Sequence, residues 1–158
     1  MHLMMRTLLS VVLFATNAPL FAQHINDSLL AKVARRFEET QHLSLQKIIP
    51  PTALQAGQMP EERLPCYPGR QVTVVAIFDK KPVAAYGRML VMKRITSTTQ
   101  FDEHLFQRAG YDETFKVNYV LLSVYFPPEA TYKNCNTILQ VYDKKEPSNK
   151  VWLIILTK

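Results

Sequence analysis

The residues of this sequence that could do covalent chemistry begin with its two cysteines, Cys66 and Cys135. A thiol beside an imidazole is the arrangement that nucleophilic catalysis uses, and Cys66 with His42 or His104 is the pairing this chain could offer. The residues that follow the thiol, Tyr67-Pro68-Gly69, match no familiar nucleophile context. A disulfide between the two cysteines would consume the same sulfur, so the two interpretations compete.

Metal ligation and acid–base catalysis have weaker candidates. The densest cluster of possible ligands is Asp102-Glu103-His104. We expect it on a short helix, where three successive side chains point in different directions and cannot hold one ion. The adjacent pairs Glu38-Glu39 and Glu61-Glu62 would have to face a common cleft to act as acid and base, and a solvated surface is the default for both.

The sequence contains no glycine-rich motif for phosphate or dinucleotide binding, because its four glycines are isolated from one another. We therefore predict no catalytic residues, no metal site and no cofactor. The formal net charge is +6, but the basic residues are scattered in short groups such as Lys80-Lys81 and Lys144-Lys145. A nucleic-acid footprint is usually a clustered basic patch within a recognisable motif, so we predict no nucleic-acid partner.

The first 22 residues have the three parts of a secretory signal peptide. A basic residue, Arg6, precedes the apolar run Thr7 to Ala15, and Ala22 stands before the polar Gln23. The run is shorter than the roughly 20 residues of a bilayer-spanning helix. We predict cleavage after Ala22, which leaves residues 23–158 as a single periplasmic or secreted domain that is not integral to the membrane.

Export bears on the cysteines, because disulfides form and persist in oxidising compartments. We therefore predict a Cys66–Cys135 disulfide, with two free thiols as the alternative. Hydrophobic residues make up 47% of the chain and charged residues 20%, a composition typical of a folded domain rather than a disordered segment.

We predict the helices, strands and loops that position these residues from the spacing of apolar residues and from the positions of proline and glycine. Asn26-Asp27 can cap a helix, and Leu29, Leu30, Val33 and Phe37 recur at helical spacing, which predicts an amphipathic helix over 27–42. Residues 48–69 carry five prolines and form a predicted loop, since no helix or central strand survives that density of proline.

The rest of the chain indicates mostly strands. Alternation predicts a hairpin of 72–78 with 83–95, then a short helix lined by Phe101, Leu105 and Phe106 that ends at Gly110. Three further strands are expected at 115–126, 137–142 and 151–157, the last two paired as a hairpin. The order α-β-β-α-β-β-β predicts an α+β fold with a mostly antiparallel sheet of about five strands and two helices.

Both faces of several predicted strands are apolar, and two helices can cover only one face of the sheet. The second face could be covered by the proline-rich loop, by strong sheet curvature, by a second copy of the chain or by a different protein. The residues of this possible interface are Val75, Ile77, Val120, Leu122, Val124, Trp152 and Ile154.

Taken together, these features predict an exported binding module without enzymatic activity. Its partner would be a protein or a second copy of the chain, held by the sheet face or by the 48–69 loop, and an inhibitor or immunity-type role fits its size and export. The alternative is a periplasmic small-ligand binder or a hydrolase-like enzyme whose site assembles only in the fold, and a deep pocket would favour that alternative.

Overall fold

The computed structural model describes residues 24–52, 59–95, 98–106, 108–128 and 135–158. These residues form one helix and nine strands. The predicted signal peptide, residues 1–22, lies outside the described part of the chain. None of the helical structure described is both long enough and apolar enough to cross a bilayer.

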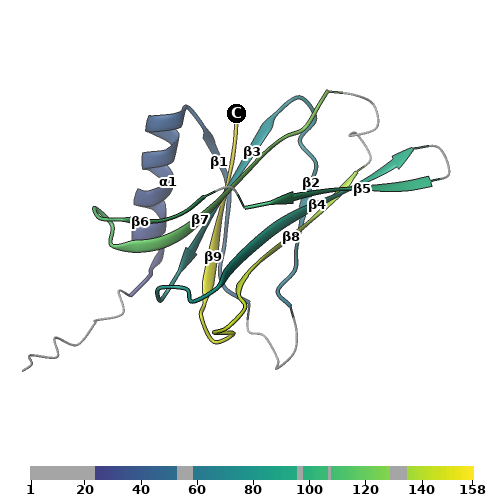
Figure 1. Cartoon of the computed structure of the whole chain (residues 1–158). Helices are drawn as coiled ribbons and strands as arrows, with labels where there is room; N and C mark the ends of the chain where they lie inside the picture. The colour runs from purple at the N-terminus through teal and green to yellow at the C-terminus, as the bar shows by residue number, and fades with distance from the viewer. Residues whose placement is uncertain (1–23, 53–58, 96–97, 107, 129–134) are drawn as a thin grey trace, which may run out of the picture.

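The strands form two antiparallel sheets (Figure 1). The elements are α1 (Asp27–Gln41), β1 (Ser44–Ile49), β2 (Glu62–Pro65), β3 (Gln71–Phe78), β4 (Ala85–Ile95), β5 (Thr98–Leu105), β6 (Arg108–Asp112), β7 (Val117–Tyr125), β8 (Asn136–Asp143) and β9 (Val151–Thr157). One sheet has five strands in the order β1-β9-β3-β7-β6, and the other has four in the order β2-β8-β4-β5. The α+β class with a mostly antiparallel arrangement is therefore confirmed.

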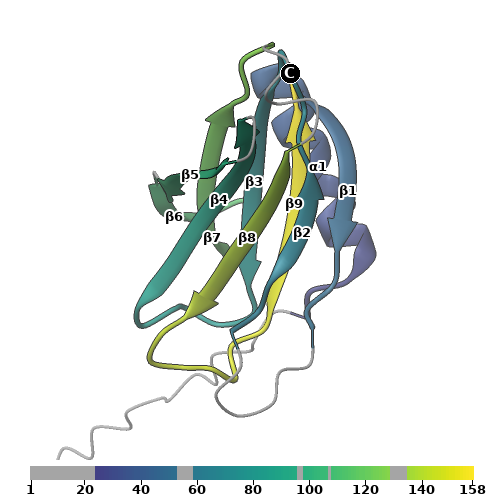
Figure 2. The same cartoon turned by 90° about the vertical axis from the view of Figure 1, so that its right-hand side faces the viewer.

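The molecule has three layers, with the five-stranded sheet in the middle (Figures 1 and 2). Helix α1 begins where expected, because the Asn26 side chain accepts a hydrogen bond of 2.9 Å from the Leu29 N–H. It ends at Gln41, followed by His42 in the left-handed conformation. The four-stranded sheet covers the opposite face of the five-stranded sheet.

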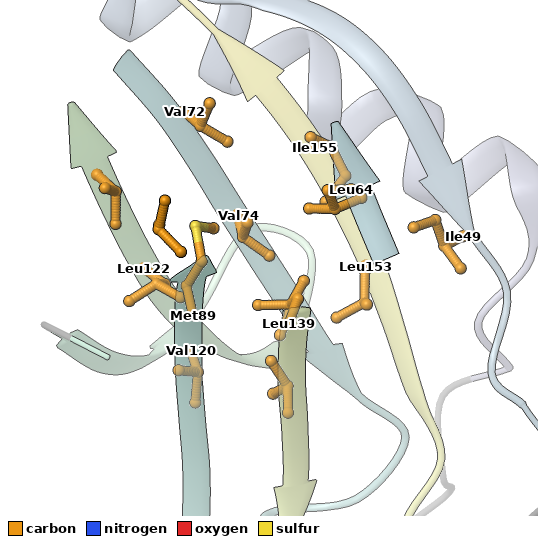
Figure 3. Close-up of a cluster of buried hydrophobic side chains, with 14 of the residues drawn as sticks. Ile49, Leu64, Val72, Val74, Met89, Val120, Leu122, Leu139, Leu153 and Ile155 are labelled. Atoms are coloured by element: carbon orange, nitrogen blue, oxygen red, sulfur yellow. The ribbon is translucent and has the colours of Figure 1, made fainter. Parts of the chain in front are cut away.

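Two apolar cores result, one on each side of the middle layer. Between helix and sheet, Leu30 and Val33 of α1 pack with Val75 of β3 and Ile154 of β9. Between the two sheets, alternate residues of the same strands meet the second sheet, as Figure 3 shows for Val74, Leu122, Met89 and Leu139. The middle sheet is apolar on both faces because it is buried on both.

The second predicted helix is wrong. Residues that we expected to form it, including Phe101 and Leu105, lie in β5, which pairs with β4, and Gly110 lies in β6, which pairs with β7. In β5, Phe101, Glu103 and Leu105 point to one face and Asp102 and His104 to the other. Side chains in this segment alternate between the two faces, as in a strand. Phe101 and Leu105 stand four residues apart, a spacing that also puts two side chains on one face of a helix, and this is why a helix was predicted.

Both predicted hairpins are wrong as well. The strands β3 and β4 belong to different sheets, and so do β8 and β9. Each short connection carries the chain from one sheet across to the other, whereas the described hairpins are β4–β5 and β6–β7. Crossing between layers, rather than turning back within one, gives two sheets where we predicted one. The count rises from the predicted five strands to nine because β1, β2, β5 and β6 form in segments where we expected no strand.

The residues predicted as an interface are in the two cores. Val75, Ile77 and Ile154 are fully buried beneath α1, and Val120, Leu122 and Val124 are at most 4% exposed beneath the second sheet. Trp152 is partly buried at the margin of the helix-side core. The second apolar face is covered by strands of this same chain, so these side chains offer no surface to a partner in this fold.

Candidate functional site

A concavity of about 590 Å³ is lined by residues of both sheets and by the segments that follow β1 and precede β2. Here β1 and β8 end while β2 and β9 begin, so four strand termini surround one opening. We call this concavity the inter-sheet pocket. Its volume lies within the range of about 300 to 1,000 Å³ that is usual for small-molecule sites.

The depth of the inter-sheet pocket is lined by core side chains. Leu139 and Val141 of β8 belong to one sheet and Leu153 of β9 to the other, and each is less than 8% exposed. Figure 3 shows Leu139 and Leu153 facing one another between the ribbons. The pocket therefore gives a ligand access to the apolar space between the two sheets.

The walls of the pocket come largely from the proline-rich segment. Pro50, Pro51 and Thr52 follow β1, and Met59 and Pro60 precede β2. Proline lacks a backbone N–H and has a fixed φ, so these walls present rigid apolar surface with few donors that a ligand would have to satisfy.

Polar residues of the lining come from β2, from the segment after β1 and from the connection between β8 and β9. Glu62 accepts a hydrogen bond of 3.4 Å from the Thr52 hydroxyl, across the gap between the two proline-containing walls. Lys150 is exposed on the opposite side of the opening. A ligand in this pocket would thus meet apolar contacts inside and charged groups of both signs at the entrance.

A buried carboxylate, Asp143, holds this end of the sandwich together. It is 1% exposed, and it accepts hydrogen bonds from the backbone N–H groups of Val83 at 2.7 Å, Ala84 at 2.9 Å and Lys145 at 3.1 Å. The Asn149 amide adds a fourth donor at 3.4 Å. The carboxylate therefore joins the connection between β3 and β4 to the connection between β8 and β9.

The neighbours of Asp143 extend the same junction. The Asn149 side chain accepts from the Lys80 N–H at 3.2 Å and donates to the Lys80 carbonyl at 3.3 Å. The Asp79 side chain accepts from the Lys150 N–H at 2.8 Å. These bonds fix the loop that carries Pro147, Ser148 and Asn149, which form part of the pocket wall.

The hydrogen bonds of Asp143 also set its ionisation. Burial of the carboxyl group, the largest single influence, raises its pKa, but the N–H groups of Val83, Ala84 and Lys145 together with the Asn149 amide lower it. The net result is a pKa below the ordinary value. Since both oxygens are occupied by these donors, the carboxylate is a structural anion rather than an acid or base exposed to a substrate.

The predicted disulfide is present and supports the wall formed by β2. Cys66 and Cys135 are bonded with a Cα–Cα distance of 5.8 Å. They stand next to Pro65 and Asn136, the last pair of the β2–β8 ladder, so the covalent bond continues the register of the two strands. Because β2 has only four residues and lies at the edge of its sheet, the disulfide is an important attachment for it.

The other candidates from the sequence do not converge. Cys66 is in the disulfide and offers no thiol, His42 is exposed after α1, and His104 lies on β5. Within the described ranges, no group of three or more histidine, cysteine, aspartate or glutamate side chains could hold a metal ion. Of the paired carboxylates, Glu62 reaches the rim of the inter-sheet pocket, and Glu61 accepts a hydrogen bond of 2.6 Å from Gln140.

Sequence reasoning missed the importance of residues 143–150, which connect the two strands that we predicted to pair as the last hairpin. The available signal was that Asp143 follows a strand directly and Asn149 stands among turn residues, since both residue types often bond to nearby backbone. Nothing local in the sequence indicates that their partners are Lys80, Val83 and Ala84. Comparisons with protein-family models, with curated proteins and with solved structures found no significant match to this chain.

Proposed function

We propose that this protein is an exported binding module without enzymatic activity, and that the inter-sheet pocket binds a small apolar ligand. The observation that carries this proposal is the access the pocket gives to Leu139, Val141 and Leu153, three core side chains from two facing sheets. Export rests on the predicted signal peptide, with which a disulfide in the folded domain is compatible.

The ligand class follows from the lining. Apolar side chains and proline rings make up most of the lining of the inter-sheet pocket. Apolar area that a ligand removes from water contributes roughly 25 cal/mol per Å² to binding. The charged groups at the entrance, Glu62 and Lys150, would remain in contact with water. A flexible hydrocarbon chain or a compact aromatic compound fits these conditions better than a sugar or a nucleotide, which would leave its polar groups unpaired in the pocket.

A binding role is favoured over catalysis by the state of the polar groups. The buried carboxylate near the pocket, Asp143, has both oxygens engaged by N–H donors. General acid–base catalysis needs a group within hydrogen-bond reach of the proton it transfers. The Asp143 carboxylate therefore acts as a structural anion and is not placed to transfer a proton to or from a ligand in the pocket.

A second candidate keeps the same pocket but fills it with a side chain from a protein partner. It is favoured by Met59, which is 56% exposed at the rim although it is apolar. Methionine and aromatic residues are enriched at protein interfaces. In this version the proline-rich segment is the contact surface, and free small ligands would bind weakly or not at all.

The test is a titration of the folded protein with an environment-sensitive apolar dye, followed by displacement with medium-chain fatty acids and alcohols. We expect saturable binding and displacement. Met59→Asp should weaken dye affinity about tenfold, because it puts a charge against the ligand at the rim.

The matched control is Tyr111→Asp on β6, which changes another exposed residue, 47% accessible, that does not line the pocket. It should leave dye affinity unchanged. Absence of saturable binding by the native protein, or equal losses in the two variants, would refute the small-ligand proposal.

A further inference from the structure

The two sheets have four edge strands, and β5 differs from the other three. β2 has four residues and ends in Pro65, β6 has five residues, and the β1 ladder shifts register at Leu45/Lys47. Short length, proline, bulges and charged side chains, lysine above all, are among the devices by which proteins keep an edge from pairing with another chain. β5 has eight residues in continuous register with β4, and its sequence, TTQFDEHL, contains neither lysine nor proline.

Apolar side chains are exposed along this edge. Phe101 is 62% exposed and Leu105 is 56% exposed, on the same face of β5 with Glu103 between them. Figure 1 shows the β4–β5 hairpin extending beyond the rest of the sandwich. A long strand with exposed apolar residues at a sheet edge is a surface suited to pairing with a further strand.

The backbone of β5 is oriented for such pairing. Phe106 donates its N–H to the Gly87 carbonyl at 2.8 Å, one position beyond the Arg88–Leu105 pair. Hydrogen-bonded and non-bonded pairs alternate along an antiparallel ladder. Residues 106, 104 and 102 therefore direct their N–H and C=O groups to β4, and Phe101, Glu103 and Leu105 direct theirs to the free edge.

We propose that β5 pairs with β5 of a second copy, antiparallel, about a twofold axis at Glu103, to form one continuous eight-stranded sheet. This register puts Phe101 opposite Leu105 of the other copy and Asp102 opposite His104. Each match occurs twice by symmetry, so the strand is its own complement in side-chain type.

The remaining pair, Glu103 with Glu103, has its charge balanced within each copy. Arg88 donates to Glu103 at 3.2 Å, so two guanidinium groups would flank the two carboxylates at the axis. These guanidinium groups offset the repulsion that two acidic side chains would otherwise cause at the centre of the interface.

The state of association is measured by sedimentation velocity on the full disulfide-bonded protein at about 0.1 mM. We expect a dimer for the native chain and for Val83→Lys, which alters an exposed apolar residue elsewhere. Phe101→Lys puts a lysine on the edge and should give a folded monomer, with the fold checked by circular dichroism. A monomeric native protein, or a dimer that Phe101→Lys does not dissociate, overturns the proposal.

Cysteine cross-linking tests the register. Glu103→Cys puts two thiols on opposite sides of the axis, at a Cα–Cα distance near 5.5 Å, which a disulfide can bridge. Thr99→Cys, also exposed on β5, puts its two thiols about 27 Å apart. We expect a covalent dimer from Glu103→Cys and none from Thr99→Cys; the reverse pattern, or cross-linking of neither, contradicts this register.

Discussion

Asp143→Ala is expected to lower the free energy of unfolding by about 3 to 5 kcal/mol, because it leaves buried N–H donors without a charged acceptor. Three of these donors are backbone groups, at Val83, Ala84 and Lys145, and they belong to two separate connections between the sheets. Domains of ordinary size have a total stability of about 5 to 15 kcal/mol. The variant should therefore be only marginally folded.

Urea denaturation followed by tryptophan fluorescence measures this effect, because the single Trp152 lies beside the helix-side core. Asp79→Ala is the matched control. It removes a carboxylate from the same junction, and that carboxylate accepts a hydrogen bond from the Lys150 N–H. It should cost about 1 kcal/mol. Equal effects of the two substitutions would mean that Asp143 does not hold the connections together.

The pKa of Asp143 also predicts how stability depends on pH. Its pKa is lower in the folded protein than in the unfolded chain, so the ionised carboxylate stabilises the fold at neutral pH. This contribution is complete above the unfolded value of about 3.9 and is lost as the pH falls through the lower folded value. Asp143→Asn should show a smaller loss of stability over that acid range than the native protein does.

Removal of the Cys66–Cys135 disulfide is expected to cost about 4 kcal/mol, since the bond closes a loop with a sequence separation of 69 residues. For a domain of this size that loss corresponds to a fall in Tm of about 10 °C or more. The double variant Cys66→Ala with Cys135→Ala tests it by differential scanning calorimetry.

The native protein with a reducing agent is the matched comparison for that double variant, and the two should melt together. A thiol titration in denaturant should find no free thiol before reduction and two afterwards. An unchanged Tm after reduction would show that the disulfide contributes little, and a free thiol before reduction would show that it does not form.

Much of the local structure could be predicted because its signals are local. The Asn26 cap and the spacing of Leu29, Leu30 and Val33 predicted α1 to within one residue at its end. The strands at 72–78 and 151–157 were predicted from their apolar runs and are present with similar bounds. These features depend on neighbours in the sequence, which is why periodicity finds them.

The layered arrangement could not be predicted, because it depends on where each connection leads. Asp79 to Ala84 reads as a hairpin turn, yet the N–H groups of Lys80, Val83 and Ala84 bond to Asn149 and Asp143, more than fifty residues away. Such distant partners leave no local pattern. The same reasoning explains why Val120 and Ile154 were named as part of a possible interface, although this chain covers them itself.

The candidate site was predicted in part. The predicted 48–69 loop is wrong in part, because Glu62–Pro65 form the edge strand β2 and β1 runs to Ile49. Its prolines were recognised, and Pro50, Pro51 and Pro60 supply pocket walls. The depth of the pocket comes from Leu139 and Leu153, which read only as strand residues. A concavity between two sheets exists only after the sheets have packed, so no single segment encodes it.

A methyl-detected NMR titration with a medium-chain fatty acid tests the central proposal most directly, because it reports where the ligand binds. Shifts are expected at the methyl groups of the lining residues Met59, Leu139, Val141, Val151 and Leu153. The helix-side core supplies the internal control, and the methyl groups of Leu30 and Val33 should not move. Shifts at those two residues without shifts at Leu139 and Leu153, or no saturable shift at all, would contradict the assignment of the inter-sheet pocket as the binding site.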